Sequence, residues 1–134
     1  MSPDTKLAAH VDRFGSVRVL CVGDVMLDCF VYGHVDRISP EAPIPVLRVE
    51  REAAMLGGAG NVVRNIVGLG ASVEFVSVVG SDSAGLEVTG LVGQLQGVEP
   101  HLLVERQRQT TIKRRFVAGS QQLLRADQET VAPL

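Results

Sequence analysis

The chain has 134 residues, 46% of them hydrophobic and 21% charged, which fits one globular domain or part of one. Thirteen Lys and Arg residues against fifteen Asp and Glu residues give a net charge of −2, so no basic surplus exists to grip a nucleic-acid backbone. Neither a secretory signal nor an apolar run of roughly 18 residues, the length of a membrane span, occurs. We therefore expect a soluble cytoplasmic protein that binds neither nucleic acid nor membrane.

The run at 17–27, VRVLCVGDVML, predicts a strand buried on both faces, as in a parallel sheet. Asp24 interrupts this run directly after Gly23. It either caps a turn just past the strand or points into the crevice where open α/β sheets bind ligands. We favour the crevice, because it also fits the segments that follow. Cys21 and Cys29 have no partner at metal-ligand spacing, so we expect free thiols.

Residues 28–50 contain three prolines and no helical period. Short β-rich pieces at 29–32 and 46–49 flank a turn-rich centre. Prolines in this number favour edge strands or an excursion away from the main sheet. The segment therefore predicts a small β flap.

A glycine cluster at 57–60 precedes a helix predicted by apolar residues at i, i+4 spacing, with Gly70 at its C′ position. The cluster fits neither the dinucleotide fingerprint nor the P-loop. It either lets a helix N-terminus approach a polar ligand closely, with Asn61 as donor and acceptor, or forms a tight loop that needs positive φ. Spacing alone leaves both interpretations open.

The second half of the chain predicts a strand at 73–79 and strands at 101–105 and 111–118. Between the first two lies a helix capped by Asp82 or Ser83 and ending at Gly97. Its expected apolar stripe consists of Leu86, Thr89, Val92 and Leu95.

In the last of these strands, Lys113 and Arg115 fall on one face because side chains alternate along a strand. Ile112, Arg114 and Phe116 fall on the other face. The face with Lys113 and Arg115 is cationic enough to meet an anion.

Four sequence blocks carry a resemblance: GDVMLD at 23–28, RISPEAPIPV at 37–46, GGAGNVxRN at 57–65 and QQLLRAD at 121–127. They resemble the N-terminal part of the ribokinase-like (phosphofructokinase B) sugar kinases. Within that family the chain is most similar to the D-glycero-β-D-manno-heptose 7-phosphate kinases, including the kinase half of bifunctional heptose kinase/ADP-heptose synthases. The resemblance implies an α/β fold, a mostly parallel sheet with flanking helices, and a small β lid at about 28–50 and 111–118. Residues 1–134 would form the acceptor-binding part of a single kinase domain.

The same resemblance implies where the acceptor sugar binds. Asp24 would hydrogen-bond sugar hydroxyls, and Asp28 lies in the same motif. Gly57 and Gly58 would let the backbone approach the sugar, which Asn61 would contact.

Charge and location suggest further residues for the phosphate of the acceptor. Lys113, Arg115 and Arg125 are the candidates for binding the 7-phosphate. Gln121 and Gln122 would shape the same rim.

In this family a later G-x-G-D motif supplies the anion hole and the catalytic Asp, and nothing after Asp82 offers it. We therefore expect no catalytic residue in this chain, and we assign ATP and Mg²⁺ to the complete kinase. That kinase would phosphorylate heptose 7-phosphate at C1 in ADP-heptose and lipopolysaccharide core synthesis, and the lid would pair two copies as a homo-oligomer. These residues alone should be inactive. Alternatives are a non-catalytic sugar-phosphate-binding or oligomerisation module, and a related kinase for another sugar.

Overall fold

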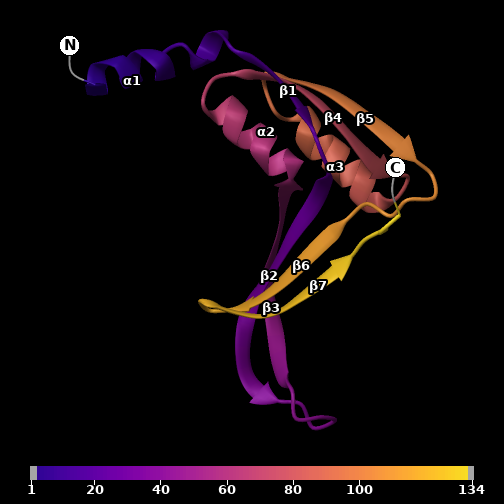
Figure 1. The fold of residues 1–134 in the computed structure, drawn as a ribbon. Coiled ribbons are helices and arrows are strands. Elements are labelled where there is room, and N and C mark those ends of the chain that lie inside the picture. The colour runs from indigo at the N-terminus through magenta and orange to yellow at the C-terminus, as the bar shows by residue number, and fades with distance from the viewer. Residues whose placement is uncertain (1–2, 133–134) are drawn as a thin grey trace.

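A computed structural model describes residues 3–132 and contains two sheets joined end to end (Figure 1). Among these residues no helix combines the length and apolarity needed to cross a membrane. The elements in chain order are α1 (Pro3–Val11), the 3-10 helix η1 (Phe14–Ser16), β1 (Arg18–Val22), β2 (Val25–Ile38), β3 (Pro45–Gly58), α2 (Ala59–Gly68), β4 (Ser72–Gly80), α3 (Ser83–Gly93), β5 (Val98–Glu105), β6 (Ile112–Ala118) and β7 (Gln121–Gln128).

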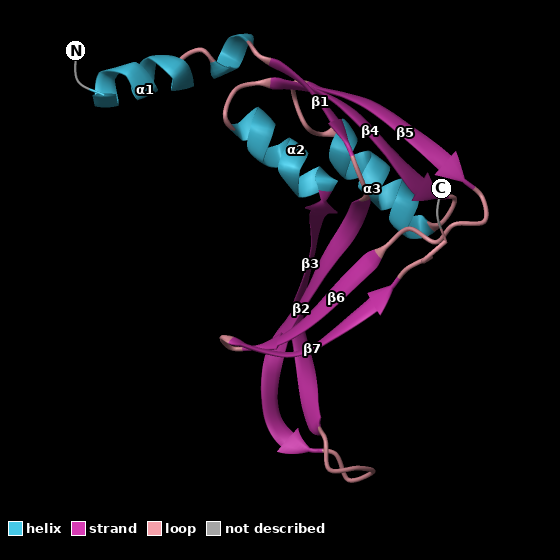
Figure 2. Ribbon diagram, viewed as in Figure 1, coloured by secondary structure: helices cyan, strands magenta, loops and turns pink. Residues whose placement is uncertain are grey.

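The first sheet is parallel, with strand order β1-β4-β5, and α2 and α3 pack on one of its faces (Figure 2). Phe75 of β4 lies fully buried beneath the two helices. Val25, Leu27 and Leu56, from the β2 and β3 ends nearest the first sheet, belong to the same hydrophobic core. The second sheet is therefore rooted in the core of the first.

The opposite face of the parallel sheet is open among the described residues. Leu20 and Val22 of β1 are 64% and 68% exposed, and Leu103 of β5 is 63% exposed. The predicted burial of the first strand on both faces is therefore wrong for residues 3–132. Because α2 and α3 both lie on one side of the parallel sheet, no described helix covers the apolar residues on its other side.

The second sheet has the strand order β3-β2-β6-β7. β2 and β3 are each 14 residues long, far longer than the predicted β pieces, and they form an antiparallel ribbon. β6 pairs with β2 only as far as Gly33, so the ribbon continues beyond it as a two-stranded arm. Pro40 and Pro43 lie in the turn and Pro45 begins β3, positions where proline removes no interior ladder bond.

α2 and α3 begin where the sequence indicates, but α3 differs from prediction in its length and its buried face, and α1 and η1 were not predicted. Gly70 follows α2 with φ +94°, as a C′ glycine does, and Asp82 is the N-cap of α3. However, α3 ends at Gly93, and Leu86 is 75% exposed. A Cβ on Gly85 would lie 2.2 Å from the Gly80 carbonyl oxygen, so this close approach turns a different face toward the sheet. The buried residues of α3 are Ala84, Gly85, Val88 and Val92.

The first connection between the sheets is the break at Gly23 and Asp24, which separates β1 from β2. The buried Ser77 hydroxyl of β4 donates to the Gly23 carbonyl oxygen at 2.7 Å. The same hydroxyl accepts from the Val25 amide at 3.0 Å. Ser77 thus satisfies two backbone groups that the break leaves beside the core.

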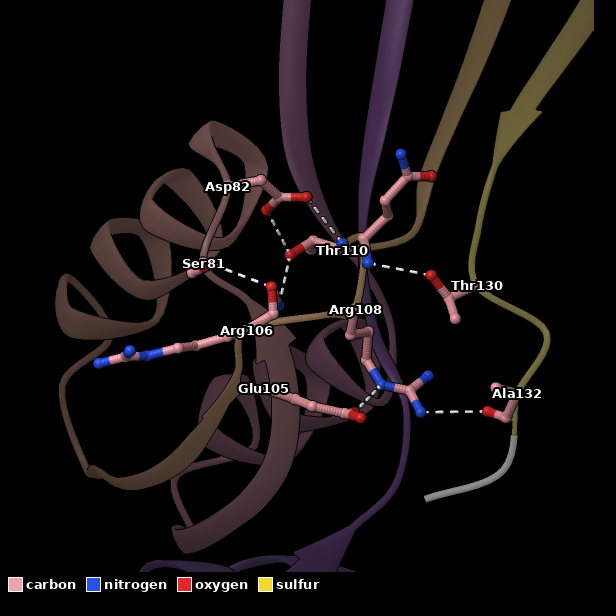
Figure 3. A network of polar contacts seen from close by, with 10 residues as sticks. Ser81, Asp82, Glu105, Arg106, Arg108, Thr110, Thr130 and Ala132 are labelled. Atoms are coloured by element: carbon pink, nitrogen blue, oxygen red, sulfur yellow. Dashed lines mark hydrogen bonds and ion pairs between the residues drawn. The ribbon is translucent and has the colours of Figure 1, made fainter.

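The second connection runs through Asp82, which joins the start of α3 to the loop that precedes β6 (Figure 3). Its Oδ1 accepts from the Gly85 amide at 2.8 Å and from the Thr110 hydroxyl at 2.7 Å, and its Oδ2 accepts from the Thr110 amide at 2.9 Å. The Thr110 hydroxyl also accepts from the Gly80 amide at 2.8 Å. Burial disfavours the ionised form of Asp82, but these hydrogen bonds outweigh burial and lower its pKa below the ordinary value.

Replacing Ser77→Ala should destabilise the chain by about 1–3 kcal/mol, because the Gly23 carbonyl and the Val25 amide would be left without a partner. Urea unfolding measures the loss. Ser72→Ala, an exposed serine of the same strand, is the matched control and should change stability by less than about 0.5 kcal/mol. Equal stability of the two variants would contradict the bridging role of Ser77.

Replacing Asp82→Asn should destabilise the chain at about pH 7, and the difference from wild type should shrink in acid. A carboxyl whose pKa is lowered by folding contributes fully above its unfolded pKa of about 3.9, and the contribution is lost as the pH falls through the lower folded pKa. Unfolding free energies from about pH 7 to pH 2 test this, with the exposed Asp12→Asn as control. A difference that stays constant over this range would exclude the ionised carboxylate as its source.

Candidate functional site

A pocket of about 430 Å³ lies at the joint between the two sheets. Its walls come from the β1–β2 break and start of β2, from Val78 of β4, from residues 108–111, from Lys113 of β6 and from residues 129–132. A volume of this size is typical of small-molecule sites. The joint is therefore the candidate binding site of the chain.

Asp24 lines this pocket from the turn that ends β1. Its carbonyl oxygen accepts from the Ala59 amide at 2.9 Å, which fixes the turn against the start of α2. The residue is exposed and lines the pocket, and its contact with a ligand stays a prediction.

The far wall of the pocket is held by the loop that precedes β6 (Figure 3). Arg108 contacts Glu105 at 2.5 Å and donates to the Ala132 carbonyl oxygen at 3.1 Å. The Gln109 amide donates to the Thr130 hydroxyl at 2.9 Å. These contacts tie the segment after β7 to the loop, so both stay beside Asp24.

Where β2, β6 and β7 pair, five charged side chains share one face of the second sheet. The register pairs Asp28 with Lys113 and Lys113 with Asp127, and it pairs Arg115 with Arg125. Residues directly opposite on neighbouring strands project to the same face. The predicted placement of Lys113 and Arg115 on one face is thus confirmed, and Lys113 also lines the pocket.

Ion pairs organise this charged face. Arg115 Nη1 donates to Asp28 Oδ1 at 2.6 Å, while Asp127 accepts from Lys113 Nζ at 3.4 Å and from Arg125 Nε at 2.9 Å. Partial desolvation disfavours ionised Asp127, but the hydrogen bond and charge of Arg125, with the charge of Lys113, lower its pKa below the ordinary value. Among these five side chains, three cations face two carboxylates, which leaves a surplus of one positive charge. Arg51 of β3, opposite Tyr32, adds a further cation to the same face.

The two glycines at the end of β3 are glycine for different reasons. Gly58 has φ +56°, and a Cβ there would lie 2.5 Å from the Asp24 carbonyl oxygen. Gly57 does not have a positive φ, but a Cβ there would lie 2.4 Å from Asp28 Oδ2. The loop interpretation of the glycine cluster therefore applies to Gly58, whereas Gly57 provides space.

Of the predicted site residues, only Asp24 and Lys113 line the pocket. Asp28, Arg115 and Arg125 lie on the charged face and the two glycines end β3, whereas Asn61, Gln121 and Gln122 lie elsewhere. Asn61 is exposed on the first turn of α2. Gln121 and Gln122 begin β7 beside the turn at Gly119, at the opposite end of that strand from Asp127. Their predicted contacts with an acceptor sugar stay predictions.

Sequence reasoning missed Asp127 and the loop residues Thr110 and Thr111 as parts of the site. The spacing of Arg125 and Asp127, two residues apart, would have placed both on the face of Lys113 had β7 been predicted as a strand. No comparable signal singles out the loop.

The structure also bears on the cysteine and metal predictions. Cys21 and Cys29 are free, as predicted, and burial raises the pKa of the Cys29 thiol. Within residues 3–132 no three His, Cys, Asp or Glu side chains gather as a metal site.

Comparison with curated proteins finds close relatives. The chain is 64% identical over 133 residues to the bifunctional protein HldE of Paramagnetospirillum magneticum and 60% identical over 134 residues to that of Rhodospirillum rubrum. These alignments cover 97% and 100% of this chain but 27% of each relative, in its N-terminal part. The chain thus spans about a quarter of the length of these relatives.

Comparison with solved structures identifies the fold, and a family match extends over most of the chain. A carbohydrate kinase from Agrobacterium tumefaciens superposes with a TM-score of 0.67 over 84% of this chain and 35% of that chain, at 21% identity. The predicted α/β, ribokinase-like fold is thereby confirmed. Residues 17–132 match the pfkB family carbohydrate kinases. Because that range includes both sheets and every residue lining the pocket, the chain belongs to the pfkB family of carbohydrate kinases.

Proposed function

We propose that this chain is the acceptor-binding and lid portion of a kinase that phosphorylates D-glycero-β-D-manno-heptose 7-phosphate at its C1 hydroxyl, for ADP-heptose and lipopolysaccharide core synthesis. The observation that carries the proposal is that Asp24 and Lys113 line one pocket, and that a face with surplus positive charge continues from Lys113. The acceptor is a polyol at one end and a phosphate at the other, so its site needs an acceptor of hydroxyl hydrogen bonds and a group of cations.

Each candidate residue acts through ordinary hydrogen bonding or charge. The Asp24 carboxylate accepts from sugar hydroxyls. Lys113, Arg115 and Arg125 donate to the 7-phosphate, and the planar guanidinium groups suit its oxygens. Asn61 contacts the sugar.

Three glycine and glutamine positions complete the acceptor site. Gly58 brings the backbone close to the sugar. Gln121 and Gln122 shape the outer rim of the lid sheet, defined as β3-β2-β6-β7.

ATP supplies the transferred γ-phosphoryl group and Mg²⁺ its counter-charge in the complete kinase, as the family membership implies. This chain holds and orients the acceptor, and the lid sheet limits the access of water to it. Two free thiols and the use of ATP favour the cytoplasm.

We also propose that the arm of the lid sheet, residues 34–49, pairs with the arm of a second copy. Among the described residues no third strand joins the arm, and a lone two-stranded ribbon is marginally stable in water. Ile38 and Ile44 are 62% and 56% exposed there. Asp36 and Arg48 give the arm charges of both signs, which suit pairing between identical copies.

The activity is tested by joining residues 1–134 to the remainder of the Paramagnetospirillum magneticum relative, in place of its matching segment. We expect the joined protein to release ADP in the presence of heptose 7-phosphate, and the 134-residue chain alone to release none above background. Asp24→Ala in the joined protein should raise KM for heptose 7-phosphate about tenfold, the cost of a lost hydrogen bond to a charged group. Asp12→Ala, which removes an exposed carboxylate that precedes η1 and does not line the pocket, should leave KM unchanged.

Three outcomes would contradict this proposal. Turnover by the 134-residue chain alone would show that it carries its own catalytic machinery. Binding of the sugar phosphate without turnover in the joined protein would indicate a non-catalytic module. Preference for ribose or fructose phosphates would indicate a kinase for another sugar.

The pairing of arms predicts a dimer of the joined protein in analytical ultracentrifugation. Ile38→Glu with Ile44→Glu should convert it to a monomer, because two charges would be buried between the arms. Leu86→Glu, on the exposed side of α3, is the control and should leave the mass unchanged. A dimer that survives the arm substitutions would place the interface elsewhere.

A further inference from the structure

Asp28 occupies the space that a side chain at position 57 would fill. A Cβ on Gly57 would lie 2.4 Å from Asp28 Oδ2 and 2.7 Å from Asp28 Cγ. Real Cβ atoms do not approach other heavy atoms so closely, so the position of this carboxyl depends on a glycine there. The backbone of Gly57 lies outside the positive φ region and would accept alanine.

The carboxyl held in this space contacts one of the three cations proposed for the phosphate, which are Lys113, Arg115 and Arg125. Arg115 Nη1 donates to Asp28 Oδ1 at 2.6 Å, and the two side chains are only 21% and 19% exposed. The Arg115 guanidinium also lies 5.2 Å from the centre of the Phe30 ring. The guanidinium is therefore fixed from two directions, by a carboxylate and by an aromatic ring.

Arg115 is the best fixed of the three cations. The Lys113 contact with Asp127 is longer, at 3.4 Å, and the Arg125 side chain is 50% exposed. Among the described residues, Nη1 alone of the Arg115 guanidinium nitrogens has a hydrogen-bond partner, which leaves Nε and Nη2 to donate to an anion. A side chain that is already ordered loses less freedom when an anion binds.

We infer that Asp28 and Gly57 are positioning residues for Arg115. Together these three residues, one each from β2, β3 and β6, set the preference of the site for a phosphorylated sugar. The inference rests on the proposed function. It gives Asp28 and Gly57 an indirect role, in place of the direct contact with the sugar that the resemblance implies. Gly57 supplies the space, Asp28 enters it, and Arg115 is presented to the phosphate by Asp28.

The two assignments differ in what a substitution does to a sugar without phosphate. If Asp28 and Gly57 contact the sugar itself, their replacement weakens the binding of phosphorylated and unphosphorylated heptose to the same extent. If they position Arg115, their replacement weakens only the binding of the phosphorylated sugar. Because both act on one guanidinium, their effects should also not multiply when combined.

The test measures kcat/KM of the joined protein for heptose 7-phosphate and for the same heptose without phosphate. Asp28→Asn and Gly57→Ala should each lower the ratio of the two values about tenfold, through KM for the phosphorylated sugar. The double variant should lose no more than either single variant. Asp12→Asn and Gly68→Ala are matched controls, since Asp12 is exposed and a Cβ on Gly68 meets nothing within 4 Å.

Equal losses with both sugars, or effects that multiply in the double variant, would overturn the inference. Asp28→Asn keeps the volume of the side chain, so it tests the same point even where Gly57→Ala unfolds the protein. Melting temperatures of all variants identify such unfolding.

A second readout needs no activity and so separates this inference from the proposed function. In the 134-residue chain, a fixed guanidinium should give a sharp Arg115 Nε–H signal in a ¹H–¹⁵N spectrum, assigned by its loss in Arg115→Lys. Asp28→Asn and Gly57→Ala should each broaden or remove it, and Gly68→Ala should not. A signal unchanged in both site variants would overturn the inference even if the joined protein phosphorylates heptose 7-phosphate.

Discussion

The hydrogen bonds of Ser77 across the break between β1 and β2 are the constraint on which both sheets depend. Where a chain leaves a parallel sheet beside a packed core, backbone N–H and C=O groups lose their partners in the sheet at a place that water cannot reach. One hydroxyl, acting as donor to Gly23 and acceptor from Val25, satisfies both at once. The chain can therefore turn from the first sheet into the second without opening the core, and Asp24 is presented at the turn.

The pocket follows from the fact that the chain crosses between the sheets more than once. After the break at Asp24, it returns through β3 into α2, and it crosses again between β5 and β6. Asp82 fixes that last crossing by accepting from Thr110, so the loop before β6 lies opposite Asp24. The walls are thus set by side chains that hydrogen-bond the backbone of another segment, among them Asp82 and Arg108.

The sequence predicted those features that depend on local pattern. The parallel strands, α2 with its C′ glycine, the Asp82 cap and the shared face of Lys113 and Arg115 all have such a signal. β7 was missed because it is exposed along its whole length, so no apolar alternation marks it. The role of Gly57 could not be predicted, because it depends on the register that brings Asp28 of another strand into its space.

The charged face has to meet two opposing requirements. Cations alone would attract a phosphate more strongly, but they would repel one another and remain mobile before it arrives. Asp28 and Asp127 reduce the net charge of the group they form with Lys113, Arg115 and Arg125 to one positive unit, and they fix the cations to which they are bonded. The two carboxylates thus weaken the electrostatic attraction for an anion but hold the cations in fixed positions. Fixed cations favour an anion whose shape matches their arrangement over other anions. A glycine at position 57 is the geometric condition for that order, since without its space the carboxylate of Asp28 could not reach Arg115 from where it stands.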